Sequence, residues 1–199
     1  MADLPAALWD GYRRFRDGHF VEQRARYQRL AEGQAPKTMV IACCDSRVDP
    51  AAIFDAGPGE LFIVRNVANL VPPYAPDSTY HATSAAIEFA VTGLGVAHIL
   101  VMGHAQCGGI AAALARDLDQ PLPDSFITRW MSIAREAKAM VLNQAPADPQ
   151  LAMEEAAIRA SLANLMTFPY VATRVAAREL SLHGAHFGIA DGHLTVLES

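Results

Sequence analysis

The chain has 199 residues, a length that fits one well-buried domain, and no Pro/Gly/Ser-rich linker divides it, so we expect a single domain over residues 1–199. Its net charge is -5 at pH 7 and its 16 basic residues are scattered along the chain, a pattern that argues against a nucleic-acid partner. No apolar run approaches the roughly 18 residues of a membrane span, and the first residues lack the profile of a secretory signal, so we expect a cytoplasmic protein with no membrane partner.

An amphipathic helical segment opens the chain. Aromatic and aliphatic residues between 5 and 32 recur at helical spacing among many arginines and glutamates, and the pair Asp17-Gly18 predicts a break between two helices. We interpret residues 1–33 as a helical arm that packs on a partner subunit, with a solvated helix lying on its own domain as the alternative. Residues 34–199 then form an α/β core.

Chemistry-bearing residues follow the first predicted strand. The apolar run 38–42 is typical of a buried strand, and Cys43-Cys44-Asp45-Ser46-Arg47 comes directly after it. Two thiols, a carboxylate and a guanidinium in one short segment suggest a site, because open α/β sheets bind ligands at the carboxyl ends of their strands. Asp49 and Pro50 then predict the cap and the first turn of a short helix.

Two further strands and a helix continue this pattern. Residues 61–64 predict a buried strand that ends in the polar loop 65–69, and residues 71–77 predict a proline-rich loop. A helix is predicted over 83–94 with five residues facing inward, namely Ala85, Ala86, Phe89, Ala90 and Val91. The buried run 97–102 predicts a third strand, which continues into Gly103-His104-Ala105-Gln106-Cys107-Gly108-Gly109. Because such an order favours parallel pairing, both chemistry-bearing segments should end at the same edge of the sheet.

The C-terminal half is predicted to be helical up to a closing hairpin. Helices are expected over 126–143, over 149–166 and from 168 to 183, after a loop at 117–124. Two alternating runs around Asp191-Gly192 predict a hairpin that pairs with the sheet edge. The resulting fold class is α/β, with a central, mostly parallel sheet of about four parallel strands plus an antiparallel C-terminal edge strand, flanked by helices.

Three cysteines, an odd number, do not make a disulfide framework, so each is a core residue, a reactive thiol or a metal ligand. Taken singly, a buried cysteine or a histidine at a strand end is more often an ordinary structural residue. Taken together, Cys43, His104 and Cys107 would supply two thiolates and one imidazole, a ligand set that catalytic zinc sites use with the fourth position open. We therefore expect a metal site.

These motifs resemble those of a known family. Cys-x-Asp-Ser-Arg at 43–47, Arg-Asn-Val-Ala-Asn at 65–69 and Gly-His-x-x-Cys-Gly-Gly at 103–109, in this order and spacing, resemble the plant-like type of the β-class carbonic anhydrases. The similarity runs from about Gln34 to Ile110 and returns near Phe168 and in the closing hairpin. It implies reversible hydration of carbon dioxide to bicarbonate and a proton, with one Zn²⁺ per subunit held by the three residues named above.

Further roles are implied by position in that family. A zinc-bound hydroxide would attack carbon dioxide, Asp45 would accept a hydrogen bond from it, and Arg47 would hold the Asp45 carboxylate. In the family this aspartate can instead become a fourth metal ligand in a closed state. The alternative for Asp45 and Arg47 is an ordinary salt bridge with no catalytic role. Gln34 falls where plant-type members place a glutamine that hydrogen-bonds substrate. Val40 stands where the bacterial allosteric type has a tryptophan, which argues for an open site.

A small apolar pocket is expected for the substrate. Phe62, Val67, Phe89 and Gly108 fall at pocket positions of the family, although Phe62 and Val67 also suit a plain strand core. Phe89 replaces a tyrosine of plant-type members, so a hydroxyl is missing. In related members the pocket lies at a dimer interface, which agrees with the 52% hydrophobic composition, and we expect a homo-oligomer that is at least a dimer, with a tetramer as a further option.

Other interpretations stay open. Hydrolysis of carbonyl sulfide or carbon disulfide would use the same ligands with different pocket walls, and a noncatalytic zinc-binding subunit would keep the ligands without turnover. Cys44 is interpreted as a supporting or core residue, with a redox-sensitive thiol as the alternative, and His81 is a candidate proton carrier. Gly93-Leu94-Gly95 precedes a strand rather than following one, which argues against a dinucleotide-binding fingerprint.

Overall fold

The computed structural model describes residues 4–77, 81–120, 122 and 124–198, and the chain forms two compact units, Met1–Ala35 and Pro36–Ser199. The boundary between the units falls two residues beyond the predicted arm. Among the residues described, no helix combines the length and the apolar character that crossing a bilayer requires.

The N-terminal unit is helical through the predicted break at Asp17-Gly18, so that prediction was wrong. A π-helical turn carries the chain past these two residues, and the helix is interrupted instead at Gln23, whose φ is -105° and ψ is 17°. Aromatic packing across the turn accounts for the continuity, because the rings of Phe15 and Tyr27 lie 5.9 Å apart, edge to face. The elements of this unit are α1 (Ala6–Arg14), the π turn (Phe15–His19), α2 (Phe20–Glu22) and α3 (Arg24–Leu30).

The second unit is built on one five-stranded sheet with the strand order β2-β1-β3-β4-β5. The first four strands are parallel and β5 is antiparallel to β4, which confirms the predicted fold class. The apolar, β-branched composition of β1 and β3 suits strands that are buried on both faces. The strands are β1 (Thr38–Cys43), β2 (Leu61–Asn66), β3 (His98–His104), β4 (Ser181–Phe187) and β5 (Leu194–Leu197).

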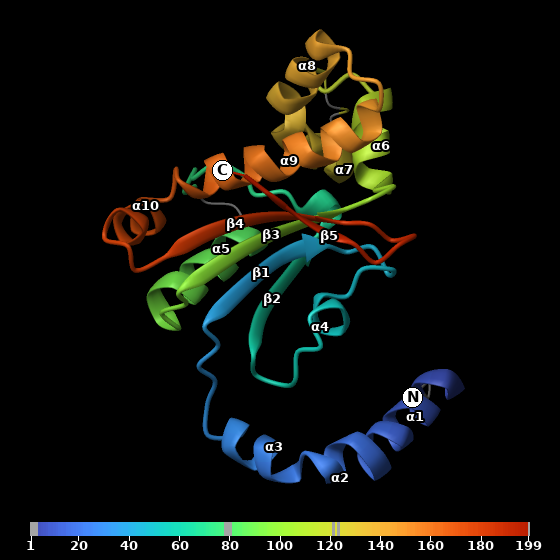
Figure 1. Ribbon diagram of the computed structural model, residues 1–199, viewed down its shortest axis with the longest axis vertical. Coiled ribbons are helices and arrows are strands. Elements are labelled where there is room, and N and C mark those ends of the chain that lie inside the picture. The colour runs from blue at the N-terminus through green and yellow to red at the C-terminus, as the bar shows by residue number, and fades with distance from the viewer. Residues whose placement is uncertain (1–3, 78–80, 121, 123, 199) are drawn as a thin grey trace. The chain divides into compact units, whose positions relative to one another are not determined.

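Helices cover both faces of this sheet. The larger core joins residues of β1 and β3 to α5, α9 and α10, whereas a smaller one packs Val40, Ala42 and Met102 against the end of α4. Figure 1 shows α9 running alongside β4 and β3, with α4 next to β1 and β2. The helices are α4 (Pro50–Ile53), α5 (Ala82–Glu88), α6 (Gly108–Ala115), α7 (Phe126–Met131), α8 (Arg135–Gln144), α9 (Pro149–Leu165) and α10 (Pro169–Ala176), with 3-10 turns at Val67–Asn69 and Ser132–Ala134 and a π turn at Phe89–Gly93.

Several local predictions hold in this unit. The side chain of Asp49 accepts a hydrogen bond from the Ala51 amide at 2.8 Å and caps α4, as predicted. The helices expected over 126–143 and 149–166 are present, the first of them with a 3-10 turn between α7 and α8. The C-terminal hairpin is also present, closed by the Gly188 amide donating to the His193 carbonyl at 2.8 Å. Within the predicted loop at 117–124, residues 121 and 123 lie outside the described residues.

The predicted helix from 168 to 183 was wrong in its second half. α10 ends at Ala176, Arg178 turns the chain in the left-handed region with a φ of 60°, and the following residues form β4. Pairing with β3 along the whole of β4 satisfies main-chain groups that helical hydrogen bonds would otherwise have used. Tertiary pairing therefore overrides the local helical pattern.

Four smaller differences from the sequence predictions concern the burial, bounds or presence of elements. β2 is an edge strand of the described chain and is only half-buried, with Ile63 36% exposed, although the sequence predicted a buried strand. The predicted polar loop 65–69 begins inside β2. On α5 and its π turn, Ala85 and Phe89 were predicted to face inward but are exposed, whereas Ile87 is buried. The sequence analysis did not anticipate α6.

Close packing of α9 on the sheet depends on a glycine in β4. A Cβ atom at Gly184 would lie 2.9 Å from Cγ2 of Ile158 and 3.0 Å from Cδ1 of Leu162. Those distances are shorter than buried carbon atoms tolerate, so the helix can approach the strand only because residue 184 lacks a side chain.

We expect Gly184→Ala to lower the free energy of unfolding by about 1–3 kcal/mol, because the added methyl overpacks the contact with α9. Urea unfolding followed by circular dichroism measures this. Ser181→Ala, an exposed change on the same strand, is the control and should stay within about 0.5 kcal/mol. Equal stability of the two variants would contradict the packing argument.

Candidate metal centre

Three buried side chains meet beyond the carboxyl edge of the sheet. Cys43 is the last residue of β1, His104 is the last residue of β3, and Cys107 follows in the loop that leads into α6. One ligand atom from each lies within 4.8 Å of the other two, and the two Sγ atoms are 4.0 Å apart. The structure therefore brings together the three residues that the sequence singled out, although they come from distant parts of the chain.

The imidazole of His104 has a defined orientation and tautomer. Its Nδ1 lies 2.9 Å from the Ala105 carbonyl, which can only accept a hydrogen bond, so Nδ1 carries the proton and Nε2 keeps a lone pair. His104 is 1% exposed, and its Nε2 has no hydrogen-bond partner among the described residues. Burial would lower the pKa of His104, but its contacts with Cys43 and the Ala105 carbonyl raise it overall. A buried lone pair without a donor is the feature that a metal ion would satisfy.

The two thiols behave as a coupled pair. The contact between the two sulfur atoms lowers the pKa of Cys43 and, together with burial, raises the pKa of Cys107. A bound cation would displace the thiol protons and leave two thiolates. Cys44 is exposed and is not a member of this cluster, and burial and the neighbouring Cys43 raise its pKa. Two potential thiolates and one neutral imidazole fit a zinc ion.

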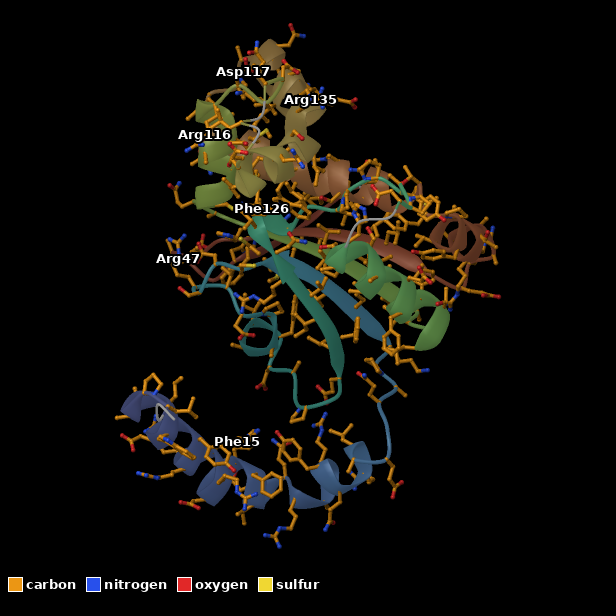
Figure 2. The ribbon with its side chains drawn as sticks, turned by 180° about the vertical axis from the view of Figure 1, so that it is seen from behind. Phe15, Arg47, Arg116, Asp117, Phe126 and Arg135 are labelled. Carbon is orange, nitrogen blue, oxygen red and sulfur yellow. The ribbon has the colours of Figure 1, made fainter. Side chains whose placement is uncertain are left out.

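Asp45 and Arg47 form a bidentate ion pair at the mouth of this cluster. Nε of Arg47 donates to Oδ1 of Asp45 at 2.9 Å and Nη2 donates to Oδ2 at 2.7 Å, while the Arg47 amide adds a third bond at 3.0 Å. Nη2 also donates to the Gln106 carbonyl at 3.1 Å, which ties the arginine to the His-x-x-Cys loop. Figure 2 shows Arg47 beyond the carboxyl ends of the strands.

This ion pair fixes both the charge and the direction of Asp45. The hydrogen bonds from the Arg47 side chain and amide hold the pKa of the Asp45 carboxyl well below its usual range, so it is ionised at neutral pH. Oδ2 of Asp45 lies 4.0 Å from Nε2 of His104. An anionic acceptor therefore stands beside the lone pair that faces the cluster.

Arg65 supports the site, although the sequence analysis quoted it only as part of the motif 65–69 and gave it no role. Its Nε donates to the Cys43 carbonyl at 2.8 Å, and its Nη2 donates to the Asp45 carbonyl at 2.6 Å. It also lies 3.7 Å from Asp49. One side chain from β2 thus holds the main chain on both sides of Cys44. The signal that could have found it is its place at the carboxyl end of the strand next to β1.

A buried polar cluster lies behind Cys107 and also escaped the sequence analysis. Oε1 of Glu154 accepts a hydrogen bond from the Cys107 amide at 2.9 Å and one from Gln150 at 2.6 Å, and its Oε2 lies 2.9 Å from Nε2 of His186. Burial would raise the pKa of Glu154, but these donors lower it overall. In the sequence, Glu154 looks like a surface charge on a predicted helix, so no local signal marks it.

Two of the predicted pocket residues lie next to the cluster. Val67 follows β2 directly and is 36% exposed, and the indole of Trp130 donates to its carbonyl at 2.8 Å. A Cβ atom at Gly109 would lie 2.9 Å from Cγ1 of Val67, so the first turn of α6 packs against this side chain. A Cβ atom at Gly108 would meet no atom within 4 Å. Space beside Gly108 is therefore open.

Phe62 is not brought to this cluster within one chain. Phe62 pairs with Met39, four residues before the Asn66–Cys43 pair, which is ~13 Å along a strand. Its ring lies 5.8 Å from that of Phe89, which is 51% exposed. Gln34 is exposed and belongs to the N-terminal unit. His81 lies 2.9 Å from Oδ1 of Asp77.

Comparison with known proteins identifies the family. A carbonic anhydrase family model matches residues 38–194, most of the chain. The chain is also 38% identical over 202 residues to beta carbonic anhydrase 3 of Arabidopsis thaliana, covering 98% of this chain and 78% of that protein. The chain belongs to the β-class carbonic anhydrases. This confirms the resemblance that the motifs indicated, and it places the chain in an enzyme class whose name implies hydration of carbon dioxide.

Solved structures of β-carbonic anhydrases share the whole fold. The structure of the beta-carbonic anhydrase CcaA superimposes with a TM-score of 0.88 at 31% identity, covering 96% of this chain and 94% of that chain. A structure from work on two tetrameric beta-carbonic anhydrases of the ascomycete Sordaria macrospora superimposes with a TM-score of 0.78 at 31% identity, covering 97% and 93%. The similarity therefore includes the helical start of the chain as well as the sheet.

We expect Arg65→Met to lower the free energy of unfolding by about 1.5–3 kcal/mol, because two hydrogen bonds from a charged donor to main-chain carbonyls are lost. Chemical denaturation measures it. Arg159→Met serves as the control, since the Arg159 guanidinium pairs with Glu155 at the surface, and this loss should be about 0.5 kcal/mol or less. If Arg65→Met and Arg159→Met lowered the free energy of unfolding equally, Arg65 would not stabilise the main chain at Cys43 and Asp45.

Proposed function

We propose that the protein catalyses the reversible hydration of carbon dioxide to bicarbonate and a proton, with one zinc ion per subunit held by Cys43, His104 and Cys107. The observation that carries the proposal is the buried, unpartnered Nε2 of His104, which lies among two thiols and beside the Asp45–Arg47 pair. A zinc ion bound there would make a hydroxide nucleophile available at neutral pH, because the metal lowers the pKa of water from about 15.7 toward 7.

Asp45 would orient the nucleophile. An ionised carboxylate can only accept hydrogen bonds, so a hydroxyl group in front of Asp45 must point its hydrogen at the carboxylate and its lone pair toward the substrate. Arg47 keeps the Asp45 carboxylate in place. The hydrogen bond from Arg47 to the Gln106 carbonyl holds the Asp45–Arg47 pair next to the loop that contains Cys107. This bidentate arrangement supports an open site, because Asp45 would have to leave Arg47 in order to become a fourth metal ligand.

A second subunit would complete the substrate pocket. Phe62 lies too far along β2 from the cluster to line the pocket of its own chain, and Phe89, in the π turn after α5, packs against Phe62, so both can act as pocket walls only for a partner. The exposed apolar side chains of Phe89 and Ile63 support a homo-oligomer that is at least a dimer, and the tetrameric assembly named for the Sordaria enzymes agrees with that size. We place Gln34 in the shared site as a substrate-binding residue and Gly108 beside the open space near the metal.

We expect Cys107→Ala to lose zinc and activity together, and Asp45→Asn to keep zinc but lose about 10- to 100-fold in turnover, since the amide no longer offers the same acceptor. Metal analysis of the purified variants and stopped-flow hydration assays measure the two effects. Loss of zinc from both variants to the same degree would contradict the separate roles of ligand and acceptor.

The substrate itself is tested by direct comparison. Carbonyl sulfide and carbon disulfide hydrolysis would use the same ligand set, so the zinc-replete protein should be assayed with all three substrates. We expect carbon dioxide hydration to have the highest kcat/KM. Zinc-replete protein that does not hydrate carbon dioxide would overturn the proposed function, and it would leave a hydrolase of the sulfur compounds or a noncatalytic zinc-binding subunit. The cytoplasmic location predicted from the sequence is tested by fractionating cells.

A further inference from the structure

The three proposed ligands are held by two different means. Cys43 and His104 belong to the sheet, where Cys43 pairs with Asn66 and His104 pairs with Phe187, so hydrogen bonds to neighbouring strands fix their main chains. Cys107 lies outside the sheet, after Gln106, which adopts a left-handed φ of 56°. Its position must therefore be set by something other than strand pairing.

Both main-chain polar groups of Cys107 are bound by side chains of α9. The Cys107 amide donates to Oε1 of Glu154 at 2.9 Å, and Nε2 of Gln150 donates to the Cys107 carbonyl at 3.2 Å. Residues 150 and 154 are one helical turn apart and so project from the same face of α9. Gln150 also donates to Oε1 of Glu154 at 2.6 Å, which links the two side chains to each other.

The Glu154 carboxylate is itself held from two sides. Gln150 binds Oε1, and His186 of β4 binds Oε2 at 2.9 Å. Glu154 is 3% exposed and His186 is buried, so the carboxylate has no bulk water to replace a lost partner. A buried carboxylate with all its donors in place is rigid, because any movement would break a hydrogen bond in a medium that does not compensate for it.

We infer that Glu154 is a positioning residue for the metal ligand Cys107. Gln150 and His186 fix Glu154, Glu154 fixes the Cys107 amide, and the main chain of Cys107 in turn sets where its Sγ lies relative to Cys43 and His104. This inference rests on the proposed zinc site. The inference goes beyond that site. It holds that the Glu154 carboxylate, which would not touch the metal, sets the geometry of the third ligand and the time that zinc stays bound.

The test compares Glu154→Ala, Glu154→Gln and the control Glu155→Ala in the zinc-loaded protein. Glu155 is the adjacent residue of α9, and its carboxylate pairs with Arg159 at the surface, so its loss changes the net charge equally without reaching Cys107. Zinc release to an excess of the chelating dye 4-(2-pyridylazo)resorcinol gives the dissociation rate. The absorption of the protein loaded with Co²⁺ reports the geometry of the ligands.

We expect zinc release from Glu154→Ala to be about 10- to 100-fold faster than from the wild type, with a changed Co²⁺ spectrum. Glu154→Gln keeps an oxygen that can accept from the Cys107 amide, so it should release zinc close to the wild-type rate, and Glu155→Ala should match the wild type. Wild-type release and an unchanged Co²⁺ spectrum in Glu154→Ala would overturn the inference, because a purely structural role would lower stability without altering either measurement.

A second variant covers the case in which Glu154→Ala does not fold. Gln150→Ala removes a donor to the Cys107 carbonyl and to Glu154 from a half-buried position, so it should also speed zinc release and shift the Co²⁺ spectrum. Wild-type behaviour of Gln150→Ala would then overturn the inference. If wild-type protein held no zinc, the proposed function would fail instead, so the two failures can be told apart.

Discussion

Parallel pairing of β1 with β3 is the constraint on which the rest of the site depends. The strands run in register from Thr38 and His98 to Ala42 and Met102, so their next residues emerge together at one edge of the sheet. Strand pairing thereby places Cys43 and His104 in proximity although sixty residues of chain separate them. The edge of the sheet thus holds the main chains of two of the proposed ligand residues through strand pairing. The third ligand residue, Cys107, lies outside the sheet.

Two carboxylates serve this edge in opposite ways. Asp45 stands at the open side of the cluster, where Arg47 keeps it ionised and directed at the space in front of His104. Glu154 stands behind the cluster, where burial is nearly complete and its oxygens are all used by donors of the protein. The first is positioned to act on a group that enters the site, whereas the second acts only on the protein itself. Environment, rather than residue type, separates their roles.

Much of this arrangement follows from local sequence patterns. Apolar, β-branched runs locate β1 and β3, the Asp-Pro pair locates the start of α4, and the glycines around His104 and Cys107 indicate a close approach of the main chain. Predictions failed where long-range pairing decides the outcome. Residues 181–183 leave the helical pattern because β3 offers them a partner, and the burial expected for β2 fails because it is an edge strand in a single chain. Periodicity within a segment contains no information about its neighbours.

No role was predicted for Arg65 and Glu154 for the same reason. An arginine at a strand end and a glutamate on a helix give no sign of their partners until the fold brings a carbonyl or an amide to them. The same limit applies between subunits. The rings of Phe62 and Phe89 contact each other within one chain, and this contact does not identify a partner surface.

α9 binds more than one loop at the edge of the sheet. Besides the bonds to Cys107, two side chains of α9 bind Val71. Oγ of Ser161 accepts a hydrogen bond from the Val71 amide at 3.1 Å, and Asn164 donates to the Val71 carbonyl at 2.8 Å. The amide hydrogens of Cys107 and Val71 are therefore bound by the same helix, although 35 residues lie between them. Exchange of either amide hydrogen with solvent deuterium requires its hydrogen bond to a side chain of α9 to open, so one helix protects both the loop at Cys107 and the segment after Asn69.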